Sequence, residues 1–260
     1  HGVINRTAEL ITGLRSPRWA VDAAIAAWVK RDRIELRDFE DRRFESLSDF
    51  FLRRLRDGAR PIGAGLVAPC DGRIVGSGRI ERDTILQVKG IPLSVDRLVH
   101  GARPTAPRWD LSRYEGGAYV TTFLSPRGYH YVHAPLAAHV ADVRWIAGRF
   151  FPQNEDALRH IPGIYERNER AVLRLRVDAH EVAMVLVGAS VIGGIELRDL
   201  PRHAWVGPAP YRIDRAVTKG EELGHFRFGS TVVLLLPPAL VPAALPAIGR
   251  DVQMGEALQS

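Results

Sequence analysis

The apolar and polar positions of this 260-residue chain follow two different patterns. Up to about residue 57, apolar residues lie among alanines and arginines at helical spacing, which predicts helices over about 7–57. From about residue 66 onward, short apolar runs alternate with polar residues, as in Leu173, Leu175 and Val177, which arginines separate. This alternation is typical of half-buried β-strands. The predicted fold class is α+β: a mainly antiparallel β body with N-terminal amphipathic helices.

Four later segments need separate interpretation. Residues 98–116 and 150–165 are expected to form loops and short helices, and 181–195 a pair of strands with glycines at 188, 193 and 194. The apolar stretch from Val232 to Ile248 is interrupted by four prolines. A membrane-spanning helix needs about 20 mostly apolar residues with internally bonded backbone. The stretch therefore predicts a buried strand followed by an irregular tail, and no spanning helix is expected.

Charge and cysteine content narrow the classes of partner. The chain has a net charge of +6 and a pI near 9.9, which favours an acidic partner such as an anionic membrane or nucleic acid. A single cysteine, Cys70, excludes an internal disulfide and a cysteine-rich zinc site, and it favours a reducing compartment.

The most informative short motif is Gly229-Ser230-Thr231, which joins a charged segment to the apolar run that begins at Val232. The hydroxyl of Ser230 could attack the carbonyl of Gly229. Because glycine has no Cβ, the peptide there can bend into the strained geometry that such an attack requires. By itself, the tripeptide is a weak signal, since such a sequence is far more often an ordinary turn before a strand.

Two upstream segments add an acid and two histidines. Asp71 follows Ala68-Pro69-Cys70, and the segment from Phe123 to Pro135 contains His130 and His133. An acid, a histidine and a hydroxyl can form a catalytic triad in any chain order, because geometry defines it. In isolation, Asp71-Gly72 could instead be a β-turn. The two histidines could be metal ligands, although they would face opposite sides of a strand and no third ligand is evident.

These segments, together with further blocks in the same order, closely resemble the phosphatidylserine decarboxylase proenzymes, which are self-cleaving pyruvoyl enzymes. The resemblance extends from about Phe44 to about Pro237, and more loosely over the N-terminal helices. So many ordered blocks are far more specific than any one motif. The additional blocks are residues 49–56, 60–62, 87–90, 168–170, 187–196 and 219–226.

The resemblance implies a mechanism with assigned residues. The chain would cleave itself between Gly229 and Ser230, with His133 as the base and Asp71 orienting it. Ser230 would become the covalent pyruvoyl cofactor, and no metal is implied. Phosphatidylserine would then be decarboxylated to phosphatidylethanolamine through a Schiff base with that group. His130 would donate the later proton or bind the leaving carboxylate.

The resemblance also implies an organisation and a location. Residues 1–57 would be a helical membrane-docking region and 58–260 the catalytic β-rich domain, cleaved into 1–229 (beta chain) and 230–260 (alpha chain). The two chains would remain a heterodimer, compatible with a higher homo-oligomer. Phosphatidylserine and an anionic membrane are the expected partners, nucleic acid is not, and the expected location is peripheral, on the cytoplasmic face of the cell membrane. Trp19 and Trp28, flanked by arginines, would lie at the headgroup boundary, unless they pack on the β body instead.

Two departures and two alternatives remain open at this point. The family usually carries an Asp where this chain has Gly128 and an Arg where it has Tyr131, so head-group recognition is less predictable than self-cleavage. A serine hydrolase could use Asp71, His133 and Ser230, although the chain lacks a Gly-x-Ser-x-Gly pattern around Ser230. A non-enzymatic basic membrane-surface scaffold would leave the three catalytic segments unexplained.

Overall fold

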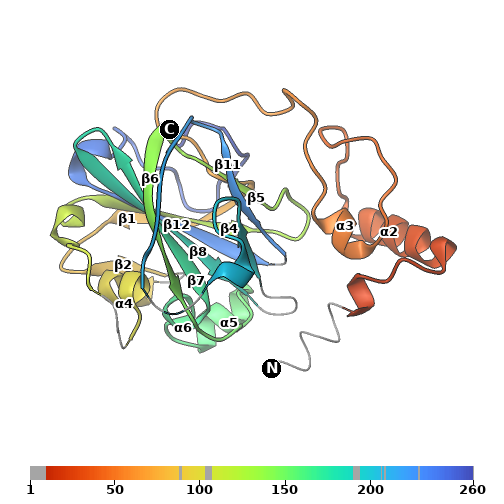
Figure 1. Cartoon of the computed structure of the whole chain (residues 1–260), viewed down its shortest axis with the longest axis horizontal. Helices are drawn as coiled ribbons and strands as arrows, with labels where there is room; N and C mark the ends of the chain where they lie inside the picture. Colours follow the sequence, from red (N-terminus) through yellow and green to blue (C-terminus); the bar gives the residue numbers. More distant parts are fainter. Residues whose placement is uncertain are drawn as a thin grey trace.

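A large antiparallel sheet forms the centre of the molecule (Figure 1). The computed structural model describes residues 10–87, 90–102, 107–189, 194–205, 207, 209–227 and 229–259. The sheet has eight strands, in the order β10 (Tyr211–Val217), β6 (Ala138–Ile146), β7 (Arg170–Val177), β8 (His180–Gly188), β12 (Ser230–Leu236), β4 (Ala118–Leu124), β1 (Gly72–Arg79) and β13 (Asp251–Val252).

Two smaller sheets complete the β body. The first has three antiparallel strands, in the order β5 (Tyr131–His133), β11 (Glu222–Phe226) and β9 (Ile195–Leu197). The second is the pair β2 (Thr84–Leu86) and β3 (Pro92–Ser94). The predicted α+β class with a mainly antiparallel β body is confirmed.

Strand β12 separates two halves of the core. Successive residues of a strand point to opposite faces, and all seven residues of β12 are buried. Val232, Leu234 and Leu236 pack with residues of the three-stranded sheet, such as Val132 and Phe226. The intervening residues, Val233 and Leu235, pack in a second cluster with residues of the helices on the opposite face. Even-numbered and odd-numbered positions of β12 therefore face different environments.

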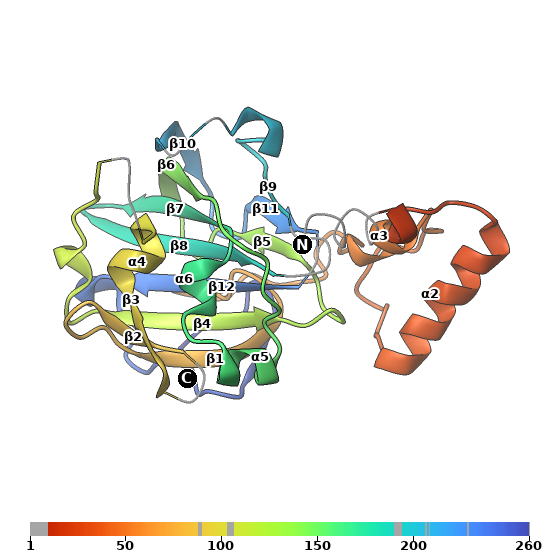
Figure 2. The ribbon, with the colours of Figure 1, turned by 90° about the horizontal axis from the view of Figure 1, so that it is seen from below.

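Short helices cover that second face. Figure 2 shows α4 and α6 in front of the large sheet, while α2 and α3 lie to one side of the β body. The α-helices whose bounds lie within the described residues are α2 (Arg18–Asp32), α3 (Leu47–Phe51), α4 (Val95–His100), α5 (Glu155–His160) and α6 (Ile164–Arg167); the 3₁₀ helices include η2 (Ser112–Tyr114), η3 (Arg202–Ala204) and η4 (Pro238–Leu240).

The prediction of helices throughout 7–57 was too generous. Helix α2 ends where Arg33 adopts a left-handed conformation with φ 52°. The following segment, 34–46, is irregular, and it turns back so that Ile34 and Phe44 pack on Phe50 of α3. Burial of these apolar side chains between two short helices outweighs the helical periodicity of the sequence.

The two N-terminal tryptophans lie in different environments. The ring of Trp28 packs against Phe50 and Phe51, with centroids 5.5 and 6.2 Å apart, and its Nε1 donates to Asp32 at 2.7 Å. Trp19 is 75% exposed. Trp19 is therefore on the outer surface, whereas the half-buried ring of Trp28 packs against α3; docking by either tryptophan stays a prediction.

The other segment predictions have mixed outcomes. Residues 98–116 and 150–165 contain loops and short helices as expected, and the C-terminal stretch forms β12 followed by the short helix η4. The expected strand pair over 181–195 is wrong, because β8 belongs to the large sheet and β9 to the three-stranded sheet. Residues 190–193, including Gly193, lie outside the described residues. In the part of the chain that the structure describes, no helix combines the length and the apolar character that crossing a bilayer requires.

Candidate active site

Ser230 is the first residue of β12 and has no exposed surface. It lies between Leu124 of β4 and Gly188 of β8 in the sheet. By the alternation of the strand, its side chain shares the face of Val232 that packs toward the three-stranded sheet. Its Oγ has no hydrogen-bond partner among the described residues. A buried hydroxyl without a partner costs free energy, which is a reason to look for a chemical role.

Gly229, just before it, is not strained. Its φ lies outside the left-handed region, and a Cβ added there would come no closer than 3.9 Å to the Cβ of Ala189. The resting conformation therefore does not itself require glycine. The conformational freedom of this residue would be used only when the carbonyl is attacked.

Asp71 is a buried carboxylate held on both oxygens. Its Oδ1 accepts a hydrogen bond from the backbone N–H of Met254 at 2.8 Å, and its Oδ2 pairs with Arg60 at 3.1 Å. Burial raises the pKa of this carboxyl, while the bonds from Met254 and Arg60 and the backbone of Tyr129 oppose the rise. The carboxylate is thus fixed in direction, with burial dominating its pKa.

His133, on β5, has both ring nitrogens engaged. Nδ1 lies 2.8 Å from the carbonyl oxygen of Gly220, and Nε2 lies 3.0 Å from the hydroxyl of Tyr129. Because a carbonyl only accepts, the proton is on Nδ1, and the Nε2 lone pair accepts from Tyr129. Burial lowers the pKa of His133. The ring is therefore neutral near pH 7, as a general base must be, but its lone pair is occupied.

Asp71 and His133 belong to the same neighbourhood without a direct hydrogen bond. The backbone N–H of His133 donates to Pro69, two residues before Asp71, at 2.8 Å. The charge of Asp71 also raises the pKa of His133, against the larger effect of burial. Among the described residues, no hydrogen bond joins Ser230 to either of them. The structure thus groups the acid with the histidine and leaves the serine hydroxyl separate in this uncleaved chain.

His130 is fully buried beside α3. Its ring centroid is 3.8 Å from that of Phe51, and Nδ1 lies 3.2 Å from the carbonyl oxygen of Gly128. Its Nε2 has no partner in the described part of the chain. Burial, and then the charge of Arg53, lower the pKa of His130 to about 3. The residue is neutral at pH 7 in this state and presents an unused lone pair.

Two arginines that sequence reasoning did not single out support this cluster. Arg53 has no exposed surface; it donates to the carbonyls of Arg127 and Gly128, the latter at 2.8 Å, and to Phe50 at 3.2 Å. Arg60 pairs with both Asp38 and Asp71. The block 49–62 was recognised in the sequence, but an arginine in a helical pattern is normally exposed, so its periodicity carried no signal of burial.

The two departures from the family pattern lie in this same cluster. A Cβ added at Gly128 would lie 3.4 Å from the Cβ of Asp71, so an aspartate here would bring a second carboxyl close to the first. Tyr131 donates its hydroxyl to Leu52 at 3.2 Å, and the guanidinium carbon of Arg54 lies 4.5 Å from its ring centroid. The guanidinium of Arg54, from the N-terminal segment, therefore lies beside position 131 of β5, where the family usually carries an Arg and this chain has Tyr131.

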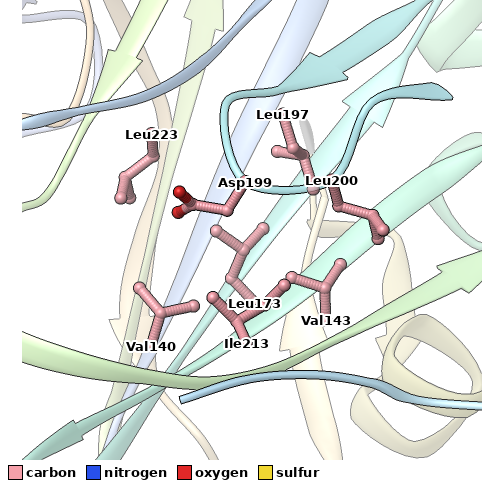
Figure 3. A pocket seen from close by; sticks show the side chains of 8 residues that line it. All are labelled: Val140, Val143, Leu173, Leu197, Asp199, Leu200, Ile213 and Leu223. Carbon is pink, nitrogen blue, oxygen red and sulfur yellow. The ribbon is translucent and has the colours of Figure 1, made fainter. Parts of the chain in front are cut away.

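Two hollows lie near the three-stranded sheet, and they differ in character. An open groove of about 470 Å³ runs between the N-terminal segment and Tyr131, lined by Gly13, Arg15, Arg42, Ser46, Ser48, Asp49, Leu52, Arg54 and Tyr131. Figure 3 shows a much smaller cavity of about 10 Å³, apolar apart from Asp199, which pairs with Arg215 at 2.7 Å. The second has room for about one water, and none of the predicted site residues lines it; its lining is Val140, Val143, Leu173, Leu197, Asp199, Leu200, Ile213 and Leu223.

The described residues contain no group of three or more histidine, cysteine or acidic side chains placed to hold a metal ion.

Comparison with known proteins agrees with the sequence blocks. The sequence profile described as phosphatidylserine decarboxylase matches residues 47–260. The chain is 34% identical to the phosphatidylserine decarboxylase proenzyme of Anaeromyxobacter sp. (strain K), over 98% of this chain and 93% of the relative. It is also 34% identical to the protein of the same description from Pseudomonas aeruginosa, over 99% of this chain and 92% of the relative. The proenzyme from Stutzerimonas stutzeri is 33% identical, over 92% and 83%. The chain belongs to the phosphatidylserine decarboxylase family.

Proposed function

We propose that this chain is a proenzyme that breaks its own Gly229–Ser230 bond and then decarboxylates phosphatidylserine to phosphatidylethanolamine. The observation that carries the proposal is the state of Ser230, in a chain of this family. It is the first residue of a buried strand, has no exposed surface, and keeps an Oγ without a partner among the described residues.

The bond rearrangement uses groups of the chain alone, and one water enters only in the last step. His133 Nε2 would accept the proton of Ser230 Oγ and return it to the nitrogen of residue 230 as the C–N bond breaks, while Oγ bonds to the Gly229 carbonyl carbon. The resulting ester would lose the Ser230 Cα proton and its Cβ–O bond, releasing a carboxylate on Gly229. Water would then replace the amino nitrogen of residue 230 as ammonia. The bond from Nδ1 to Gly220 supports this role, since it directs the basic lone pair to Nε2.

The surroundings of residue 230 fit a small buried carbonyl group. Leu124 lies opposite Ser230 on β4, but Gly188 on β8 and the preceding Gly229 carry no side chain, and Ala189 is the nearest side chain to a Cβ at position 229. A pyruvoyl group formed there supplies a carbonyl that withdraws electrons from a bound amine. His130 is neutral with a free Nε2, so an approaching substrate carboxylate would raise its pKa and favour a proton on that nitrogen.

The burial of Ser230 disfavours the serine hydrolase alternative. A hydrolase must present its nucleophile to an external ester, whereas Ser230 has no exposed surface in the intact chain. Attack on the adjacent Gly229 carbonyl needs no access from outside. Breaking that bond would also free the chain on the Gly229 side, so a route to residue 230 would open only after maturation.

We propose that the N-terminal region docks the protein on an anionic bilayer. The proposed bilayer surface is the cytoplasmic face of the cell membrane. Apolar side chains near the start of the described chain are exposed: Leu10 73%, Ile11 57%, Leu14 56% and Trp19 75%. Arg15 and Arg18 lie among them in the sequence. Exposed apolar side chains interleaved with basic ones suit the boundary between headgroups and acyl chains. Trp28 is half-buried, with its ring against Phe50 and Phe51, so Trp19 is the better placed of the two tryptophans for this role.

Intact-mass measurement tests the proposed function directly. Purified wild-type protein is expected to resolve into residues 1–229 and 230–260, the second with a blocked, carbonyl-bearing N-terminus that reacts with a hydrazine probe. Ser230→Ala should remain one chain. The matured protein should release carbon dioxide from phosphatidylserine vesicles. Wild-type protein that stays full length after prolonged incubation, with an unmodified Ser230, would contradict the proposal.

A further inference from the structure

On the helix-covered face of the large sheet, the buried side-chain amide of Gln153 bonds to β12, which begins at Ser230, and to β8, which pairs with it. Gln153 is 4% exposed and lies in the loop before α5. Its Oε1 accepts the hydroxyl of Thr231 at 2.6 Å, and its Nε2 donates to the carbonyl of Gly188 at 3.0 Å. Thr231 follows Ser230 on β12, and Gly188 faces Ser230 from β8. One side chain thus joins the covalent neighbour of Ser230 to its cross-strand neighbour.

The orientation of this amide is fixed by its partners. The Thr231 hydroxyl donates to Oε1 and the Gly188 carbonyl accepts from Nε2, so a flipped amide would lose both bonds. A second buried amide supports it, since Asn168 Nδ2 also donates to the Gly188 carbonyl, at 2.9 Å. Asn168 is itself held by the backbone N–H and carbonyl of Phe151, each at 2.9 Å. The network is therefore closed and rigid on the face opposite to the Ser230 side chain.

At the start of β12, the side chains of Ser230 and Thr231 lie on opposite faces of the strand. Ser230 directs its side chain toward the three-stranded sheet, while Thr231 directs its hydroxyl to the opposite face, where Gln153 lies. The network can therefore hold the backbone of residue 230 without touching its Oγ. Thr231 has no exposed surface, so bulk water does not reach its hydroxyl, which also interacts with the buried hydroxyl of Tyr165.

We propose that Gln153 is a positioning residue that, through Thr231 and Gly188, holds residue 230 in place before and after the Gly229–Ser230 bond is broken. The inference rests on the proposed self-cleavage. After cleavage, residue 230 becomes a chain end, and chain ends fray unless they are tied down. Through Gln153, Thr231, the residue next to the new end, is tied to Gly188 of β8, so the reacting position keeps its direction.

Thr231 offers a matched pair of variants for the test. Thr231→Val keeps the shape of the side chain and removes the hydroxyl, whereas Thr231→Ser keeps the hydroxyl. The first-order rate constant of self-cleavage should fall about 10-fold or more in Thr231→Val, because small displacements of reacting groups cost large factors in rate. Thr231→Ser should restore it to within about 2-fold. Gln153→Met should slow cleavage as Thr231→Val does, and the double variant should be no slower than either single one.

A neighbouring residue gives a control for general loss of stability. Asn154 caps α5 through a bond from its Oδ1 to the N–H of Ala157 at 2.9 Å. Asn154→Ala should lower the melting temperature but leave the cleavage rate within about 2-fold of wild type, because the lost cap does not touch Thr231. Amide hydrogen exchange supplies a readout independent of activity. In matured protein, the amides of 232–234 should exchange faster in Thr231→Val than in Thr231→Ser.

The outcomes separate this inference from the proposed function. Thr231→Val that cleaves at the wild-type rate, with unchanged exchange over 232–234, would overturn the positioning role while self-cleavage stands. Equal slowing in Asn154→Ala and Thr231→Val would also overturn it, since stability alone would then account for the effect. Wild-type protein that never cleaves would refute both. For a positioning role, slow cleavage in Thr231→Val must be rescued by Thr231→Ser.

Discussion

The hydroxyl of Tyr129 lies 3.0 Å from Nε2 of His133 and caps the lone pair that would accept the proton of Ser230. The same tyrosine contributes its backbone to the environment of Asp71. Tyr129 is 4% exposed, so water does not compete for this contact. The hydroxyl must therefore move away, or be displaced, before His133 can act as a base.

Tyr129→Phe should change the pH dependence of self-cleavage. A hydrogen bond donated to the neutral imidazole stabilises that form and so lowers the pKa of His133. Without the hydroxyl, the pKa of His133 should rise, because the neutral ring loses a hydrogen bond. The acid limb of the cleavage-rate profile should therefore shift to higher pH, and the plateau rate should increase because the lone pair is free. Rates of chain cleavage from pH 4 to 8 measure this. An unshifted profile would show that Tyr129 does not control the base.

Substitutions of Asp71 and His133 should affect self-cleavage, whereas substitution of His130 should affect decarboxylation. His133→Ala and Asp71→Asn are expected to slow self-cleavage by about 10²–10⁴-fold, the usual contribution of general acid–base catalysis. His130→Ala should cleave at close to the wild-type rate but lose decarboxylation per matured enzyme. Gel analysis of cleavage and carbon dioxide release measure the two steps.

Asp38→Asn is the matched control for Asp71→Asn, because Asp38 is the other carboxylate paired with Arg60. It should leave the cleavage step largely intact. If His130→Ala blocked cleavage and His133→Ala did not, the two roles would have to be exchanged.

The burial of His130 predicts a pH dependence of stability. Its pKa in the folded protein is about 3, below the ordinary value of 6.5, so the unfolded chain binds more protons between these values. The free energy of unfolding should therefore fall as pH is lowered through this window. One such group contributes about 1.4 kcal/mol per pH unit there. Urea unfolding at pH 4.5, 5.5 and 6.5, in a Ser230→Ala background, should give a shallower dependence for His130→Gln. Parallel dependences would contradict the burial of a neutral ring.

Membrane docking should distinguish the two N-terminal tryptophans. Flotation with phosphatidylserine-containing vesicles should carry the protein at low salt and less at high salt, because each basic side chain near an anionic surface adds about 1 kcal/mol that salt screens. Trp19→Ser should reduce binding, since Trp19 is 75% exposed. Trp28→Ser should instead lower the melting temperature, because its ring packs on Phe50 and Phe51. Equal binding by all three proteins, or indifference to lipid charge, would place the docking surface elsewhere.

Local pattern and ordered motifs were enough to predict part of this protein. The alternation around Leu173 predicted β7, and the apolar run after Ser230 predicted β12, because a strand places alternate residues on opposite faces whatever surrounds it. The blocks around Asp71, His133 and Ser230 predicted the family, because their order along the chain is itself the signal. The helical periodicity of 7–57 was misleading, since it says nothing about whether short helices or packed loops bury the same side chains.

The tertiary structure alone decided which groups share an environment. Arg53 reads as an exposed helical arginine, yet it is fully buried against the loop that carries His130. Gln153 carries no motif at all, and its role depends on the meeting of a loop with the ends of β8 and β12. Trp19 and Trp28 have the same sequence pattern, yet Trp19 is exposed and Trp28 is half-buried against α3. Such contacts join residues far apart in the chain, and their free energy comes from burial and hydrogen bonding that exist only once the fold has formed.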